Sequence, residues 1–227
     1  MITDKEFNDT IVNCKKSIEN EWAMIMKFIA NSKSKLDTLI PLNGFIGGSC
    51  LLNFYSTGKN FSDIDYFVYD IGLSKPEYLS NTLENFPLDD IIISKKVGKT
   101  SEYDEVSTYV GDIKLKIGNL NKRELNVIFC SENPLQHFKT FDFEICNWYY
   151  DTNRNTLNIS EDAIELIKRK ELDYTEGFKK KIRQFKSENG TLSKNTLDSM
   201  MGRIKKYSER GYIPTKDMIK FIEEIKQ

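Results

Sequence analysis

The chain has 227 residues, enough to bury a sizeable core in one large domain or two small ones, and it is 39% hydrophobic and 30% charged. Its formal net charge of -1 argues against indiscriminate binding of nucleic acid through total charge alone. The charge is unevenly spread: residues 152–227 carry 17 Lys and Arg against 12 Asp and Glu, whereas residues 1–151 carry 16 against 22. This imbalance fits either a site for metal ions and a polyanion, or solvated surfaces without a ligand.

Targeting signals and metal-binding cysteine motifs are not evident in the sequence. The first residues, MITDKEFND, are polar and acidic, and no apolar stretch approaches the roughly 18 residues of a membrane span. We therefore expect a cytoplasmic protein without a membrane partner. The four cysteines are far apart and form no C-x-x-C pair, which favours buried free thiols over a zinc site.

The first predicted element is a long amphipathic helix over residues 4–31. Apolar residues recur there at steps of three and four, which places them on one face: Phe7, Ile11, Cys14, Ile18, Trp22, Ile25 and Ile29. A short strand is expected to lead into Gly47 and Gly48, followed by a helix over SCLLNFYS with Ser49 at its start. The alternating, aromatic-rich DIDYFVYD predicts a strand.

Further along, KPEYLSNTLENF predicts a helix, and DIIISKKV, VSTYVGDIKLKIG and ELNVIFC predict strands. The last two are separated by the turn signal NLNKR and should pair as a hairpin. After residue 151 a polar loop, TNRNTLNIS, is expected, and then helices only, the first of which follows Ser160. The sequence thus predicts an α+β protein in which residues 1–151 form a mixed sheet with flanking helices and residues 152–227 form a helical domain.

The segment from residue 44 to residue 70 holds the most informative motif. Asp63 and Asp65 are two residues apart on a predicted strand, so both point to one side while Ile64 points to the core. Two carboxylates so close destabilise each other unless a cation lies between them, and magnesium prefers such oxygen ligands. Upstream, the glycines permit a close backbone approach, and the helix start at Ser49 offers free N–H groups to a phosphate.

These residues resemble the nucleotidyltransferase superfamily of the DNA polymerase beta type. The matching residues are Gly47, Gly48 and Ser49, then Gly58 and Lys59, then SDID at residues 62–65. The resemblance implies that Asp63 and Asp65 bind two Mg²⁺ ions (or Mn²⁺), about 3.5–4 Å apart in such sites, and that Gly47, Gly48 and Ser49 bind the nucleotide. It also implies transfer of a nucleoside monophosphate from an NTP to a hydroxyl group.

The resemblance further implies a third metal-binding carboxylate on a later strand, and here the match is incomplete. Asp142 is the preferred candidate, because it lies between aromatic residues in FDFEIC, a segment similar to nucleotidyltransferase-like proteins of phages and large DNA viruses. Glu124 and Asp112 are the alternatives, while Asn126, in the same strand as Glu124, is neutral.

Several cations are candidates for contact with the triphosphate. Lys59 lies between the two motifs, and Lys205 and Lys206 belong to a basic helical segment beside Tyr207. A solvated helix face is an equally good explanation of the basic segment. The acceptor is left open between an RNA 3′ end such as that of tRNA, a protein hydroxyl and a small molecule. Two other hypotheses remain: an inactive nucleotidyltransferase-fold module, for instance antitoxin-like, and a helical interaction protein with an incidental D-x-D.

Overall fold

The computed structural model describes residues 2–31, 40, 43–56, 63–69, 93–97, 113–120, 123–130, 133–138 and 141–226. Seven strands form one sheet in the order β3-β4-β5-β2-β1-β6-β7. Their bounds are β1 Phe45–Gly47, β2 Asp63–Tyr69, β3 Ile93–Val97, β4 Ile113–Leu120, β5 Arg123–Cys130, β6 Trp148–Asp151 and β7 Thr156–Ile159. The helices before and around them are α1 Asp4–Asn31, α2 Ser49–Ser56 and α4 Pro134–Phe138.

The centre of the sheet is the parallel pair of β2 and β5, and the other neighbouring strands of this sheet run antiparallel. The predicted hairpin is confirmed, since β4 ends at Leu120 and β5 begins at Arg123 as its antiparallel neighbour. In the parallel pair Asp63 lies opposite Glu124 and Asp65 lies opposite Asn126. The register therefore brings polar residues of two strands together at one end of the pair.

One face of the central strands is covered by α1 and α2. Ile64, Tyr66 and Val68 of β2 share a core with the buried stripe of α1, which confirms the long amphipathic helix. The two tryptophans of the chain belong to this core: the Trp22 ring lies 4.5 Å from Tyr66, and the Trp148 ring lies 6.3 Å from Tyr55 of α2. Burial of such large rings anchors both helices to the sheet.

The opposite face of the same strands packs against α4. Phe67, Ile128, Cys130 and Phe138 form a second, smaller apolar cluster there. Asp63 and Asp65 alternate with the residues of the first core, so they lie on this second face, at the start of β2.

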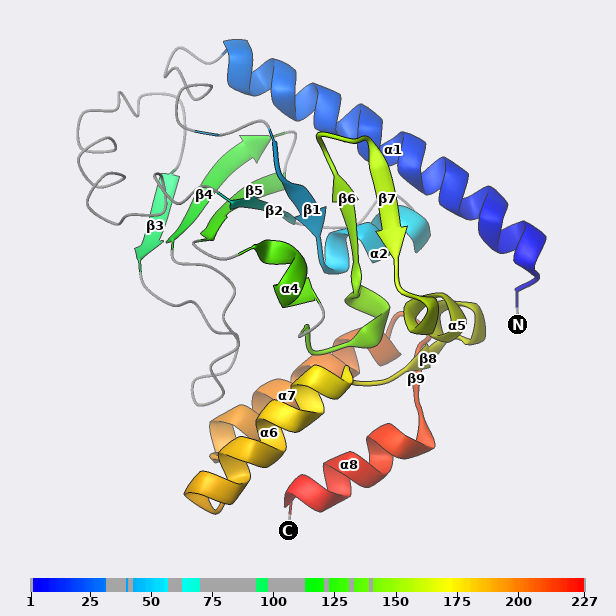
Figure 1. Cartoon of the computed structure of the whole chain (residues 1–227), viewed down its shortest axis with the longest axis vertical. Helices are drawn as coiled ribbons and strands as arrows, with labels where there is room; N and C mark the ends of the chain where they lie inside the picture. Colours follow the sequence, from blue (N-terminus) through cyan, green and yellow to red (C-terminus); the bar gives the residue numbers. More distant parts are fainter. Residues whose placement is uncertain are drawn as a thin grey trace.

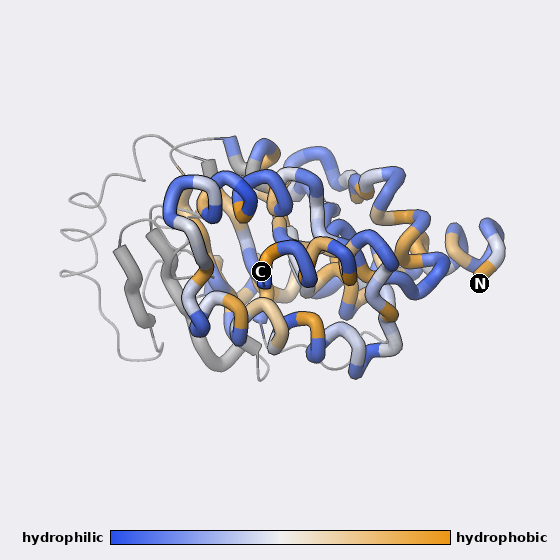
Figure 2. The backbone as a smooth tube through the Cα atoms, turned by 90° about the horizontal axis from the view of Figure 1, so that it is seen from below, coloured by the Kyte–Doolittle hydropathy of each residue, from blue (hydrophilic) through white to orange (hydrophobic). Residues whose placement is uncertain are grey.

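The C-terminal part consists of α5 Glu161–Arg169, α6 Glu176–Asn189, α7 Lys194–Ser208 and α8 Lys216–Lys226, with two short paired strands, β8 Glu171–Leu172 and β9 Ile213–Pro214. Figure 1 shows α1 along one side of the molecule and α6, α7 and α8 gathered on the other. Ser160, Thr175 and Ser193 cap α5, α6 and α7 by accepting backbone N–H groups. Polar and apolar residues alternate along these helices in Figure 2, as amphipathic helices over a core require.

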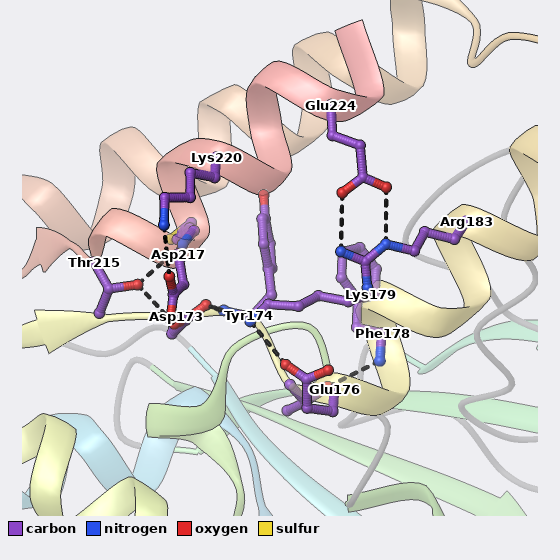
Figure 3. A network of polar contacts seen from close by, with 12 residues as sticks. Asp173, Tyr174, Glu176, Phe178, Lys179, Arg183, Thr215, Asp217, Lys220 and Glu224 are labelled. Atoms are coloured by element: carbon purple, nitrogen blue, oxygen red, sulfur yellow. Dashed lines mark hydrogen bonds and ion pairs between the residues drawn. The ribbon is translucent and has the colours of Figure 1, made fainter.

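A polar network around the buried Lys179 joins α6 and α8 to the segment that precedes α6 (Figure 3). Lys179 of α6 is 7% exposed, and its Nζ lies 3.0 Å from Asp173 Oδ1 and 2.9 Å from Glu176 Oε1. Thr215, before α8, donates its hydroxyl to Asp173 Oδ2 at 2.6 Å. Burial tends to lower the pKa of Lys179, but its bonds to Glu176 and Asp173 outweigh this and raise the pKa. The charged form of Lys179 is therefore the one that the fold stabilises.

The segment from Phe141 to Cys146 joins the sheet to the helical part. Thr175 donates its backbone N–H to the Asp142 carbonyl at 2.8 Å, and Glu144 donates to the Asp173 carbonyl at 3.0 Å. The Phe143 ring stacks on Tyr174 at 5.0 Å and meets Tyr207 of α7 at 4.9 Å. Residues 144–146 form the 3-10 helix η2 within this junction.

The α+β architecture with a helical C-terminal part is confirmed, with two corrections to the elements. The part predicted to contain helices only also holds the short paired strands β8 and β9. Residues 152–160, predicted as a polar loop, contain β7, which pairs with β6 and extends the sheet beyond residue 151. The domain boundary between residues 151 and 152 stays a prediction. The helix predicted over KPEYLSNTLENF lies outside the described residues. Among the described helices, none is long and apolar enough to cross a membrane.

Candidate active site

Asp63 and Asp65 point to one face of the sheet, as the sequence predicted. They are the first and third residues of β2, both are partly exposed, and Ile64 between them is 2% exposed on the other face. Strand geometry thus holds two carboxylates side by side. The two negative charges repel each other and destabilise the fold unless hydrogen-bond donors or cations compensate for them.

The glycine-serine bend lies beside these carboxylates. Gly47, the last residue of β1, is opposite Asp65 in the antiparallel register, so the chain turns into α2 next to that aspartate. Gly48 makes the turn with a φ of 81°, a conformation that residues with a side chain rarely adopt. A Cβ placed on Gly48 would lie 3.7 Å from Asp65 Oδ2. Ser49 is the first residue of α2, so the free N–H groups of its first turn lie near Asp65.

Cys50 confirms how close the start of α2 is to the aspartates. Its thiol is fully buried and donates to the Gly47 carbonyl at 3.2 Å. Burial raises the pKa of Cys50 well above its ordinary value, and the negative charge of Asp65 raises it further. Burial therefore favours the protonated thiol, which suits Cys50 to a packing role.

Asn126 joins the two aspartates. It is 1% exposed, and its Nδ2 donates to Asp65 Oδ1 at 2.8 Å and to Asp63 Oδ2 at 3.3 Å. Its Oδ1 is buried and has no hydrogen-bond partner among the described residues. In the sequence, Asn126 is notable only as a neutral residue. Its role as a bridge depends on the parallel register of β2 and β5, which has no local signal.

Two aromatic residues also shape the bend. A Cβ on Gly47 would lie 2.5 Å from the Phe138 ring, so packing against α4 is sufficient to require glycine there. A Cβ on Gly48 would lie 3.7 Å from the Phe141 ring, which places Phe141 beside the bend. A nucleotide-binding role of Gly47 stays a prediction, because a structural reason explains its small size.

Asp142, the preferred third metal ligand, is bound by an arginine. Its carboxylate forms a two-bond ion pair with Arg203 of α7, through Nε and through Nη2, the latter at 3.0 Å. It also accepts the backbone N–H of Phe143 at 3.0 Å, and Asp142 is 7% exposed. A metal ion would compete with Arg203 for this carboxylate, so its predicted role as a ligand is untested. No local pattern indicates this pair, because its members are 61 residues apart.

The remaining candidates are scattered. Glu124 is exposed and lies opposite Asp63 on β5. Lys205 and Lys206 lie on the exposed side of α7, where Lys205 Nζ is 4.0 Å from Glu209 and Lys206 Nζ is 5.9 Å from the Tyr207 ring centre. Lys59 and Asp112 lie outside the described residues.

The donor set at the centre of the site is two carboxylates and one amide. Within the described part of the chain, no group of three or more His, Cys, Asp or Glu side chains is placed to hold a metal ion. Carboxylate and amide oxygens are nevertheless ligands that Mg²⁺ accepts, and the buried, unbonded Oδ1 of Asn126 belongs to the same cluster. The site is therefore chemically suited to a hard divalent cation, and the start of α2 lies beside it.

Comparison with solved structures identifies the fold. A CCA-adding enzyme in an apo form aligns with a TM-score of 0.51 at 11% identity, over 92% of this chain and 42% of that one. The protein has a nucleotidyltransferase-type fold. Two structures of a tRNA-processing enzyme align less well: one with CTP at a TM-score of 0.47 and 13% identity (85% and 45% covered), and an apo form at 0.46 and 14% (81% and 44%).

These similarities have clear bounds. The chain spans less than half the length of each of the three enzymes, and the identities are too low to transfer an activity. No protein-family model and no curated protein sequence matches the chain. The three structures lend no support to a similarity with proteins of phages and large DNA viruses. The comparison therefore establishes the nucleotidyltransferase-type fold alone.

Proposed function

We propose that the protein is a metal-dependent nucleotidyltransferase that transfers a nucleoside monophosphate from an NTP to a hydroxyl group. One observation carries the proposal: the bend at Gly48 and Ser49 lies against the carboxylate of Asp65, which shares a face of β2 with Asp63. An anion site and a cation site in contact are what a nucleoside triphosphate with its metal ions requires. The nucleotidyltransferase-type fold supports the proposal.

The triphosphate is bound at the start of α2. Gly48 has no side chain to obstruct the phosphates, and the backbone N–H groups and hydroxyl of Ser49 donate hydrogen bonds to them. Lys59, Lys205 and Lys206 are the proposed cations that attract the triphosphate, as the resemblance implies. They act by long-range charge, and their effect should decline with added salt.

Asp63 and Asp65 hold the Mg²⁺ ions, for which Mn²⁺ can substitute. Asp142 is the third acid that the resemblance implies, and it would serve as a ligand only where a metal ion displaces Arg203 from its carboxylate. When bound, the ions neutralise phosphate charge and make the attacking hydroxyl more acidic. The carboxylates fix the position of this charge, and the helix start orients the α-phosphate.

In the reaction the acceptor oxygen forms a bond to the α-phosphorus. At the same time the bond breaks between the α-phosphorus and the oxygen that bridges the α- and β-phosphates. Pyrophosphate leaves with the bonding electrons, and the hydroxyl proton passes to solvent. We propose an RNA 3′ end, such as that of tRNA, as the acceptor. The similarity in fold to a CCA-adding enzyme and the basic residues of α7 favour this choice.

The test is transfer of label. Purified protein is incubated with Mg²⁺ and each of the four NTPs labelled at the α-phosphate, with and without bulk tRNA, and label in RNA is measured. We expect incorporation that Asp63→Ala abolishes and that Asp9→Ala, an exposed change on α1, leaves intact. Incorporation that persists at the wild-type rate in Asp63→Ala would refute the proposal.

A second function is favoured by Asn126. A neutral amide between the two aspartates is compatible with a nucleotide-binding module of this fold that has lost catalysis and acts as a regulator. In the same experiment such a module binds labelled NTP in equilibrium dialysis but transfers no label to any acceptor.

A further inference from the structure

One amide side chain contacts both of the paired aspartates. Asn126 lies opposite Asp65 in the parallel register, and its Nδ2 donates to a carboxylate oxygen of each aspartate. In the absence of a cation, this donor reduces the repulsion between the two carboxylates. The bridge therefore holds the two aspartates in place before any ion is bound.

The other end of the same amide is not satisfied. Oδ1 of Asn126 is buried without a hydrogen-bond partner in the described part of the chain. A buried acceptor without a partner is destabilising. The rotation of an amide about its last side-chain bond is broadly two-fold, so a half-turn that exchanges Nδ2 and Oδ1 costs little in torsion. In the described part of the chain, the two bonds to the aspartates oppose it, and a cation bound by those aspartates would replace them.

The acidic alternatives are less suitable as partners of this pair. The carboxylate of Asp142 is engaged by Arg203, and Glu124 is exposed. Among the described residues, no third acid joins Asp63 and Asp65 in a group that could hold a metal ion. Asn126, in contrast, already contacts both aspartates.

We propose that Asn126 is the third protein ligand of the cation held by Asp63 and Asp65, and that its amide turns to present Oδ1 when the ion binds. The inference rests on the cation site of the proposed function, but not on transfer itself. An amide oxygen is a hard donor that Mg²⁺ and Mn²⁺ accept. The ligand set then carries two negative charges instead of the three of a triple-carboxylate site, which weakens metal binding before the triphosphate contributes its own charge.

In the experiment the full chain is titrated with Mn²⁺ alone. Electron paramagnetic resonance measures the concentration of free Mn²⁺ at each step, which gives the binding affinity. If Asn126 is a ligand, Asn126→Leu binds Mn²⁺ at least roughly tenfold more weakly than wild type, and Asn126→Asp binds it more tightly. Asn13→Asp on α1 is the control for added charge, because Asn13 is exposed, and it should leave the affinity unchanged. Should the leucine variant not fold, as judged by circular dichroism, Asn126→Ala takes its place.

A role for Asn126 as a competitor of the ion predicts the reverse order of Mn²⁺ affinities. If Asn126 is only a hydrogen-bond donor that competes with the ion, its removal frees the carboxylates, and Asn126→Leu binds Mn²⁺ as well as or better than wild type. That result, or a wild-type chain that binds no Mn²⁺ at millimolar concentration, overturns the inference. Binding in the expected order without label transfer to any acceptor supports the inference and counts against the proposed function.

Discussion

The aspartates of this protein fall into two groups with different partners. At the junction with the helical part, Asp142 is bound by the guanidinium of Arg203, and Asp173 lies 3.0 Å from Lys179 Nζ. At the start of β2, Asp63 and Asp65 stand two residues apart and share one neutral amide. The first arrangement balances charge within the fold and stabilises it, whereas the second keeps two like charges together, which is typical of a binding site.

Replacing one aspartate of each group by asparagine should give the largest difference in the free energy of unfolding. Asp142→Asn leaves Arg203 without its buried partner and should lower the free energy of unfolding by about 3 kcal/mol. Asp65→Asn removes one of two like charges and should leave the free energy of unfolding unchanged or raise it slightly. Urea denaturation without metal measures both. Equal losses in the two variants would contradict the distinction between the groups.

The same Asp142→Asn protein also tests the predicted third metal ligand. Transfer is measured at a temperature where circular dichroism shows that the variant is folded. Loss of transfer by about a hundredfold or more supports a role for Asp142 at the reacting phosphate. A wild-type rate in the folded variant would assign Asp142 to structure alone.

Within the polar network of Figure 3, burial should decide how much each charge contributes. Lys179→Met should lower the free energy of unfolding by about 2 kcal/mol, because it leaves Asp173, whose side chain is only 17% exposed, without its cation. Glu176→Gln should change it much less, since the Glu176 side chain is 82% exposed. Thermal and urea denaturation provide the comparison, and equal effects of the two variants would exclude burial as the cause.

Glycine substitutions compare the bend with a helix interior. Gly48→Ala forces a side chain into a φ of 81° and should cost about 1–2 kcal/mol of stability, together with weaker NTP binding. Gly202→Ala, within α7 and with no atom within 4 Å of the added Cβ, should instead add about 1 kcal/mol. Calorimetric melting of both proteins checks the signs. If both variants are stabilised, the bend is not strained.

Alkaline pH should weaken the core beneath the junction. Burial raises the pKa of the Cys146 thiol from 9.0 to about 12, and the nearby charge of Asp142 also raises it. The unfolded chain therefore gives up this proton first, so stabilisation that is complete below pH 9 is lost as the pH rises toward 12. Between pH 9 and pH 10, wild type should lose about 1 kcal/mol more than Cys146→Ala. Parallel slopes of stability against pH would show that Cys146 does not contribute.

The smallest effect is expected at the exposed pair of Arg183 and Glu224. The two side chains are each 49% exposed although they form two hydrogen bonds, at 2.8 and 2.9 Å. Glu224→Gln should cost only about 0.5 kcal/mol, and less in 1 M NaCl because salt screens exposed charges. A large loss that is insensitive to salt would mean that this pair, like that of Asp142 and Arg203, is structural.

Local patterns predicted much of the fold. The three- and four-residue steps of α1, the alternation in β2 and the turn before β5 each depend on neighbours in sequence, and each is confirmed. β7 was missed because TNRNTLNIS lacks apolar alternation, and its pairing with β6 decides its structure.

The site, like the fold, could be predicted only where the signal is local in sequence. The common face of Asp63 and Asp65 follows from the two-residue period of a strand, and the glycine-serine bend from the chemistry of helix starts. Asn126 and Arg203 could not be assigned in this way. One depends on the register of two parallel strands and the other on how a distant helix packs, and neither leaves a local signal.

The two tryptophans provide intrinsic fluorescence at two different places in the core. Trp22 of α1 touches Tyr66, the residue after Asp65, while Trp148 of β6 faces Tyr55 at the far end of the helix that begins at Ser49. Replacing either one by Phe leaves a single tryptophan, whose emission can be excited selectively at wavelengths that tyrosine does not absorb. Stopped-flow fluorescence of the two single-tryptophan proteins would then separate the docking of α1 from that of α2, and the Trp22 signal would register a disturbance of β2 without any dye.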